Sequence, residues 1–150
     1  MSVRTTQVWS LRPAVPDDIE AIAELRAVVM RPDLERLGRY AEHRVRQRLR
    51  DAYAPEHTSV IEAGGAPAGC VALRPFEDGR LLEHFYLAPE LQGRGIGTAV
   101  LAGFLARTDA EGVPVRLQVL QGSAARRLYE RHGFTLERED AVDVFMVRTP

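Results

Sequence analysis

Residues 81–101 read LLEHFYLAPELQGRGIGTAVL and carry the most informative pattern in the chain. Residues 80–87 are a strand-like run, and residues 93–112 follow with the spacing of a helix. The apolar helix positions fall at i, i+3, i+4, i+7 and i+8: Ile96, Ala99, Val100, Gly103 and Phe104. Three glycines stand at the helix start: Gly93, Gly95 and Gly97. Glycines there let successive N–H groups converge, and the helix dipole attracts anions, so the segment predicts a diphosphate cradle.

Other strand-like and helical runs flank this segment. Strands are expected at residues 8–13, 57–63, 67–74, 114–120, 133–138 and 142–148. Helices are expected at residues 16–31, 34–50 and 123–132. Pro32 should end the first helix, and the second is rich in arginine, with Leu37, Val45 and Leu49 as its apolar positions. The pattern predicts an α/β (α+β) fold in one domain, residues 1–150, around a mixed sheet.

The charge composition excludes several classes of function. The chain has 20 basic and 21 acidic residues and a net charge of −1, so no global field draws it to nucleic acid, a membrane or a polyanion. All the basic residues are arginine, which excludes a lysine Schiff base and a phosphate-loop lysine. A ligand must therefore be held by a local site.

Cysteine content and hydropathy favour a cytoplasmic protein. Cys70 is the single cysteine and cannot form an intrachain disulfide. The N-terminal residues 1–13 lack the pattern of a secretory signal, and no apolar run approaches the roughly 18 residues of a membrane span. We expect a cytoplasmic location and no membrane partner.

The spacing of the glycines excludes two common nucleotide-binding motifs. The phosphate-loop pattern G-x-x-x-x-G-K-S/T is absent, and G-x-G-x-x-G fails because Thr98 stands where its third glycine would be. A lone G-x-G would indicate only a tight strand-to-helix turn. Five further matches, described next, favour a functional loop.

The chain resembles the GNAT superfamily of acyl-CoA-dependent N-acyltransferases over nearly its whole length. The family signature Q/R-x-x-G-x-G/A follows an apolar strand end and a proline, and here it is formed by Gln92, Gly95 and Gly97 after Leu87 and Pro89. The stretches LRPAVPDD at 11–18 and VLQGSAARRLYERHGF at 119–134 are also similar to family segments. The resemblance implies a mostly antiparallel sheet of about seven strands with about four helices, splayed between strands 4 and 5.

The resemblance also implies acetyl-CoA as cosubstrate and no metal. Its pantetheine arm would lie in the splayed gap, and its diphosphate would rest on the signature loop. The implied cofactor-binding residues are Phe85, Tyr86, Leu87, Gln92, Gly93, Arg94, Gly95, Ile96, Gly97, Thr98, Ser123 and Ala125. Many family members carry an asparagine where this chain has Gly122 and Ser123, and a serine hydroxyl there can cap the following helix.

Glu83 is the candidate base that deprotonates the acceptor amine, directly or through water. An amine must be neutral to attack a thioester, and an alkylamine with a pKa near 10.4 is mostly protonated at neutral pH. Strand alternation places Glu83 on one face with Leu81, Phe85 and Leu87, where apolar neighbours would raise its pKa. The alternative is a carboxylate that pairs with an arginine or only binds the substrate ammonium.

Tyr129 is the candidate that protonates the departing CoA thiolate. The family pattern A-x-x-L/F-Y-x-x-x-G-F is reproduced by Ala125, Leu128, Tyr129, Gly133 and Phe134. Ala125, Leu128 and Tyr129 share one helix face, so the ring is packed and only its hydroxyl reaches polar groups. The alternative is a core tyrosine with a satisfied hydroxyl.

Two other chemistry-bearing residues of the strands are not expected to be catalytic: His84 should be structural or lie beside the substrate, and Cys70 should be structural. His84 should alternate to the strand face opposite Glu83, and Cys70 should be a small core residue. An acyltransferase for a longer acyl-CoA and a non-catalytic acyl-CoA sensor remain alternatives. The acceptor is expected to be an amine of a small molecule or peptide, and a homodimer stays open.

Overall fold

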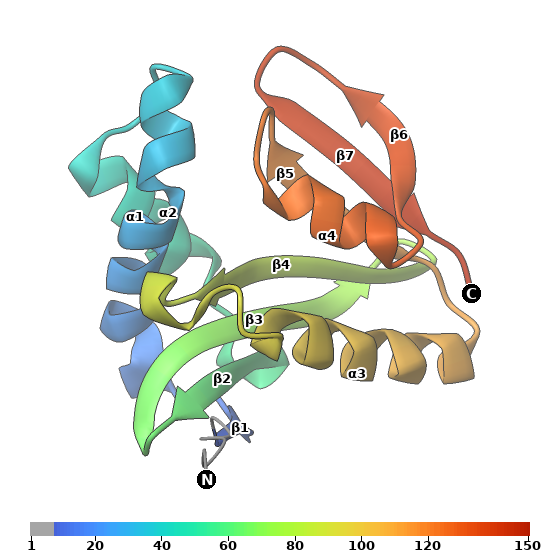
Figure 1. Cartoon of the computed structure of the whole chain (residues 1–150), viewed down its shortest axis with the longest axis horizontal. Coiled ribbons are helices and arrows are strands. Elements are labelled where there is room, and N and C mark those ends of the chain that lie inside the picture. Colours follow the sequence, from blue (N-terminus) through green and yellow to red (C-terminus); the bar gives the residue numbers. More distant parts are fainter. Residues whose placement is uncertain (1–7) are drawn as a thin grey trace, which may run out of the picture.

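The computed structural model describes residues 8–150, in which seven strands form one sheet (Figure 1). The strands are β1 Trp9–Pro13, β2 Thr58–Ala63, β3 Ala66–Phe76, β4 Gly79–Leu87, β5 Val115–Leu120, β6 Thr135–Glu139 and β7 Asp143–Arg148. Their order is β1-β2-β3-β4-β5-β7-β6, with only the β4–β5 pair parallel. The mixed, mostly antiparallel sheet is confirmed; the N-terminal seven residues of the expected domain lie outside the described part.

Two helices cover each face of the sheet. The α-helices are α1 Ile19–Arg36, α2 Glu42–Ala52, α3 Ile96–Glu111 and α4 Ala125–Arg131, and short 3-10 turns occur at Pro16–Asp18, Pro55–His57 and Pro89–Leu91. Ile22, Ala23 and Leu49 of α1 and α2 pack in one core with Val60 and Tyr86. The larger core lies on the other face, between α3, α4 and the strands. Figure 1 shows α1 and α2 side by side at the left and α3 along the opposite face.

The prediction that Pro32 ends the first helix was wrong. Helix α1 continues through Pro32 to Arg36, and α2 begins only at Glu42, not at residue 34. An internal proline costs a helix roughly 3 kcal/mol. Contacts of the last turn offset part of this cost, because Arg36 binds both Asp33 of its own helix and the carbonyl of Gln121 across the molecule, each at 2.8 Å.

Strand β4 contains a β-bulge that the expected alternation missed. Its register against β3 shifts between the pairs Cys70↔Tyr86 and Ala72↔Glu83, and His84 within the shift has a φ of +49°. The extra residue reverses the alternation, so Phe85 packs against the α3 core whereas Glu83 faces the side of α1 and α2. The expected shared face of Glu83 with Phe85 and Leu87 was therefore wrong.

Strands β4 and β5 meet only where they begin. Their paired residues are Arg80↔Val115 and Leu81↔Arg116, whereas β5 stays paired with β7 along its whole length. A glycine at position 79 allows the close approach, because a Cβ there would lie 2.0 Å from the carbonyl oxygen of Pro114. Beyond Leu81 the strands diverge, and the predicted splay between strands 4 and 5 is confirmed.

Candidate active site

A cavity of about 490 Å³ lies where β4 and β5 diverge. It reaches from the helices on one face of the sheet to α4 on the other. Its lining includes Arg26, Met30 and Asp33 of α1, Arg48 of α2, residues 81–86 of β4, residues 117–120 of β5, and Ser123, Ala125 and Tyr129. Both expected catalytic residues, Glu83 and Tyr129, therefore border one cavity, together with Phe85, Tyr86, Ser123 and Ala125.

The signature loop forms an open, glycine-lined turn ahead of α3. Gly93 and Gly95 have φ of +76° and +83°, and a Cβ at either would meet no atom within 4 Å. The Gln92 side chain donates a hydrogen bond to the Leu87 carbonyl at 2.9 Å and so fastens the loop to the end of β4. The first N–H groups of α3 have no partner within the helix. The loop can thus receive an anion.

The other loop residues divide between core and surface. Ile96 is buried and anchors the start of α3, and Gly97 faces the ring of Phe85, which a Cβ at position 97 would approach to 3.9 Å. Arg94 and Thr98 are exposed. These residues and Leu87 border the loop and not the 490 Å³ cavity. Their predicted contacts with a cofactor stay predictions.

Glu83 is held in an ion pair with Arg74. The Glu83 Oε1 atom lies 2.8 Å from Arg74 Nε, across the β3–β4 ladder. The Glu83 side chain is 23% exposed, so the pair is shielded from water in part. The arginine partner, one of the alternatives that the sequence left open, is the arrangement present.

His84 is a polar residue of the cavity, and the prediction of the strand face on which its side chain lies was wrong. Its ring does not lie on the face opposite Glu83, because Nε2 is 3.9 Å from Glu83 Oε1 and Nδ1 is 3.2 Å from the Tyr86 hydroxyl. The bulge turns the side chain toward both. Burial lowers the pKa of His84 below its ordinary 6.5, outweighing the opposing effect of Glu83. Its Nε2 is buried without a hydrogen-bond partner in the described part of the chain.

Tyr86 and Arg26 form a buried pair beside His84. Arg26 Nε donates to the Tyr86 hydroxyl at 3.0 Å, and Arg26 Nη1 donates to the Val45 carbonyl. Burial raises the pKa of Tyr86 to about 12, so the phenol stays protonated. Arg26 was not expected from the sequence, since an arginine within an amphipathic helix gives no sign of being buried.

Tyr129 presents its ring to the cavity from α4. The ring packs edge-on against Phe134, with centroids 5.6 Å apart. Burial, with a smaller contribution from the nearby Tyr86, raises the pKa of Tyr129 well above its ordinary value. The hydroxyl therefore keeps its proton at neutral pH and can serve as a donor toward the cavity.

The β5–α4 loop explains why glycine stands at position 122. Gly122 has a φ of +76°, and a Cβ there would lie 2.8 Å from Nη1 of Arg36. The guanidinium of Arg36 thus occupies the space that a side chain at this position would need. Ser123 Oγ accepts a hydrogen bond from the Ala125 amide at 3.2 Å, in keeping with the predicted cap of α4.

Cys70 is a core residue, and we expect it to be unreactive in the native protein. Burial raises the pKa of its thiol to about 12, so only about one molecule in ten thousand is thiolate at pH 8. Ellman's reagent at pH 8 should label almost no thiol in native protein and one thiol per chain in denaturant. Rapid native labelling would contradict the burial of Cys70.

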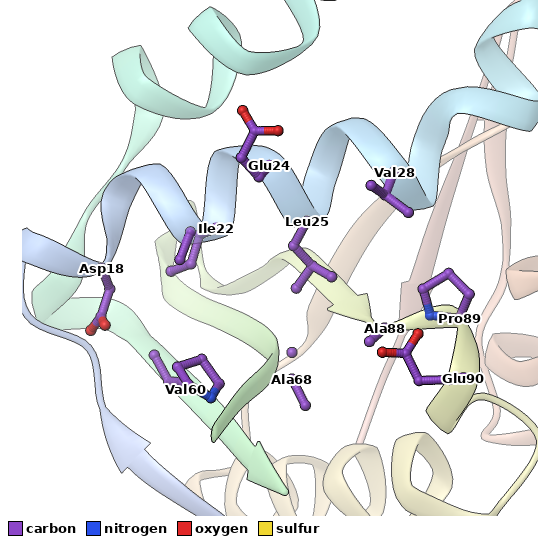
Figure 2. Close-up of a pocket in the computed structure, with 13 residues that line it drawn as sticks. Asp18, Ile22, Glu24, Leu25, Val28, Val60, Ala68, Ala88, Pro89 and Glu90 are labelled. Atoms are coloured by element: carbon purple, nitrogen blue, oxygen red, sulfur yellow. The ribbon is translucent and has the colours of Figure 1, made fainter. Parts of the chain in front are cut away.

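A second pocket, of about 350 Å³, lies between α1 and the ends of β3 and β4. Figure 2 shows Ile22 and Leu25 facing Val60 and Ala68, whereas Glu24 points away from the strands. Two of its carboxylates are already paired, Asp18 with Arg12 and Glu24 with Arg46. It contains none of the expected site residues, so the cavity between β4 and β5 is the better candidate.

Residues 8–150 offer neither a metal site nor a membrane span. They contain no group of three or more histidine, cysteine or acidic side chains placed to hold a metal ion. None of their helices combines the length and apolar character that crossing a membrane requires.

Solved structures with the same fold include N-acetyltransferases. The PaiA N-acetyltransferase from Thermoplasma acidophilum, in complex with coenzyme A, has a TM-score of 0.77 at 21% identity over 95% of this chain and 99% of that one. The ribosomal-protein-S18-alanine N-acetyltransferase from Escherichia coli has a TM-score of 0.73 at 17% identity, covering 95% and 94%. N-acetylglutamate synthase from Neisseria gonorrhoeae, complexed with coenzyme A and N-acetyl-glutamate, has a TM-score of 0.65 at 21% identity, covering 97% and 36%.

Sequence comparison supplies the family. No curated protein sequence gave a significant match. The family model for the acetyltransferase (GNAT) domain matches residues 54–136, which include β2 to α4 and the whole signature loop. Since this match covers more than half of the chain, the protein belongs to the GNAT acetyltransferase family.

Proposed function

We propose that the protein transfers the acetyl group of acetyl-CoA directly to an amine of a small molecule or peptide. The observation that carries this proposal is the single cavity between β4 and β5, which Glu83 borders from β4 and Tyr129 from α4. A transfer reaction needs two substrates to meet, and this cavity reaches both faces of the sheet. The coenzyme A in the Thermoplasma and Neisseria relatives supports the choice of cosubstrate.

The residues around the splay fit an acyl-CoA. Residues 82–87 of β4 have no partner on β5, so backbone groups on that edge are available to an extended arm. The open turn at Gly93 and Gly95 and the first amides of α3 suit a diphosphate. Bound acetyl-CoA would supply the acetyl group activated as a thioester. Backbone N–H groups near Leu87 would polarise its carbonyl.

Glu83 and Tyr129 take the two polar roles in the proposed reaction. The carboxylate of Glu83 attracts the acceptor ammonium into the cavity. A polar side chain of β4 then takes a proton from the ammonium, directly or through water. Tyr129, kept protonated by its burial, donates to the sulfur that departs. No metal takes part in this scheme, and a cytoplasmic location and a homodimer stay predictions.

Thiol release in the presence of amines tests this proposal. Purified protein is mixed with acetyl-CoA and with pools of amino acids, polyamines, aminoglycosides and peptides, and free CoA is followed with a thiol reagent. We expect release that requires an amine, with the acetylated product identified by mass spectrometry. Faster CoA release from a longer acyl-CoA than from acetyl-CoA would reassign the transferred acyl group. Acetyl-CoA binding without CoA release in any amine pool would favour a non-catalytic acyl-CoA sensor.

A further inference from the structure

The Nε2 atom of His84 lies in the cavity without a structural partner. Its side chain is 16% exposed, and its Nδ1 meets the Tyr86 hydroxyl. Its Nε2 is the one buried side-chain nitrogen or oxygen of residues 8–150 that lacks a hydrogen-bond partner. A buried polar atom without a partner destabilises the folded state. The φ of +49° adds strain, since a residue other than glycine rarely adopts it.

Which nitrogen of His84 carries the hydrogen depends on the Tyr86 hydroxyl, 3.2 Å from Nδ1. The Tyr86 oxygen accepts from Arg26 Nε at 3.0 Å and has a second lone pair that can accept from His84 Nδ1. In this arrangement Nε2 is an unprotonated acceptor. With the hydrogen on Nδ1, the hydrogen of the Tyr86 hydroxyl needs an acceptor other than His84. With the hydrogen on Nε2, the nearest acceptor is the Glu83 carboxylate, 3.9 Å away. The Nδ1-protonated tautomer leaves the lone pair of Nε2 as the basic site of the ring.

The charges around His84 suit a group that is neutral at rest and cationic for a short time. Arg26 of α1 and Arg74 of β3 oppose a positive charge on the ring, as does its burial. Arg48 of α2 lines the same cavity. Glu83 favours the charge, because its Oε1 lies 3.9 Å from Nε2. An imidazolium formed at this position would therefore be stabilised by the carboxylate beside it.

We propose that His84 Nε2 accepts the proton of the acceptor ammonium, and that Glu83 stabilises the imidazolium. This inference rests on the proposed acetyl transfer. The ammonium loses one proton to Nε2, and the free amine then forms the C–N bond while the C–S bond breaks. The second nitrogen proton is lost to solvent, and the sulfur takes its proton from Tyr129. Glu83 is the poorer first acceptor, because its Oε1 already accepts from Arg74 at 2.8 Å.

The tautomer of His84 can be tested by NMR without any acceptor. Nitrogen-15 spectra of the four imidazoles are recorded at pH 7, and the His84 signals are assigned by their loss in His84→Asn. Asparagine tolerates positive φ, so this variant is expected to fold. We expect a neutral ring with a protonated Nδ1 and an unprotonated Nε2. A neutral ring protonated at Nε2 would overturn the proposal.

The pH dependence of turnover supplies the second test. Wild-type kcat/KM should fall on the acid side only below pH 6.5, because burial lowers the pKa of His84 and only the neutral ring can accept a proton. His84→Asn should lower kcat/KM at pH 7 about 10²–10⁴-fold, lose this acid limb and keep the wild-type affinity for acetyl-CoA. The exposed His43 of α2 gives the matched control, and His43→Asn should behave as wild type.

The outcomes separate this inference from the proposed function. If the wild-type protein acetylates an amine and His84→Asn keeps its rate and its acid limb, only the role of His84 is refuted. If the wild-type protein neither binds acetyl-CoA nor releases CoA, the acetyl transfer itself is refuted, and the role of His84 falls with it. If His84→Asn loses both its rate and its acid limb while His43→Asn keeps them, the role of His84 and the acetyl transfer are both supported.

Discussion

Replacing Tyr129 with phenylalanine is expected to lower kcat by about 10²–10⁴-fold, the range that a general acid contributes. The phenylalanine keeps the ring, which packs against Phe134, and removes only the hydroxyl of a residue that lines the cavity. The affinity for acetyl-CoA should therefore stay within about twofold of wild type. Steady-state kinetics with an acceptor from the amine pools, together with calorimetry, measures both quantities.

Tyr40→Phe is the matched control for this experiment. Tyr40 lies outside the cavity. Its ring centroid is 4.6 Å from Arg31 Cζ, a cation–π contact that a phenylalanine ring also makes. This variant should keep wild-type kcat. If Tyr129→Phe also keeps wild-type kcat, Tyr129 is a core residue and some other group protonates the sulfur.

Replacing Gly95 with alanine is expected to weaken acetyl-CoA binding tenfold or more. Gly95 has a φ of +83° at the start of α3, where alanine is strained by about 1–2 kcal/mol. No atom lies within 4 Å of the new Cβ, so the effect comes from the backbone and not from a clash. If the loop relaxes to relieve this strain, its amides turn away from the anion. A loss of 1.4 kcal/mol in binding free energy corresponds to a tenfold loss in affinity.

Gly112→Ala controls for strain alone. Gly112 ends the same helix with a φ of +72°, and its Cβ position is equally open. It lies about 26 Å from Gly95 along the helix axis. Both variants should lose similar stability in urea, but only Gly95→Ala should lose affinity. Equal affinities in the two variants would contradict a role for this loop in binding.

Much of the fold could be predicted because its signals are local. Alternating and helical apolar spacing located all seven strands and α3, and the order strand, glycine loop, helix placed β4 before α3. Pro32 gave a wrong helix end because the proline rule treats a helix in isolation. The contact of Arg36 with Gln121 is made 85 residues away along the chain, and no local pattern carries it.

The site was predicted in part, for a related reason. The motif spacing predicted the positions of Tyr129, Ser123 and the loop at Gly93–Gly95. Each of them lies in or next to a helix that the same spacing predicts. The arrangement around His84 could not be predicted, because one extra residue in β4 reverses the alternation on which the assignment of faces relied. Arg26 and Arg74 were missed because their partners come from other elements.

The most direct measurement is calorimetric titration of acetyl-CoA into the purified protein, with Gly95→Ala and Gly112→Ala in parallel. The proposed function predicts saturable binding of one acetyl-CoA per chain, weakened tenfold or more in Gly95→Ala and unchanged in Gly112→Ala. No binding to the folded wild-type protein at millimolar acetyl-CoA would contradict it.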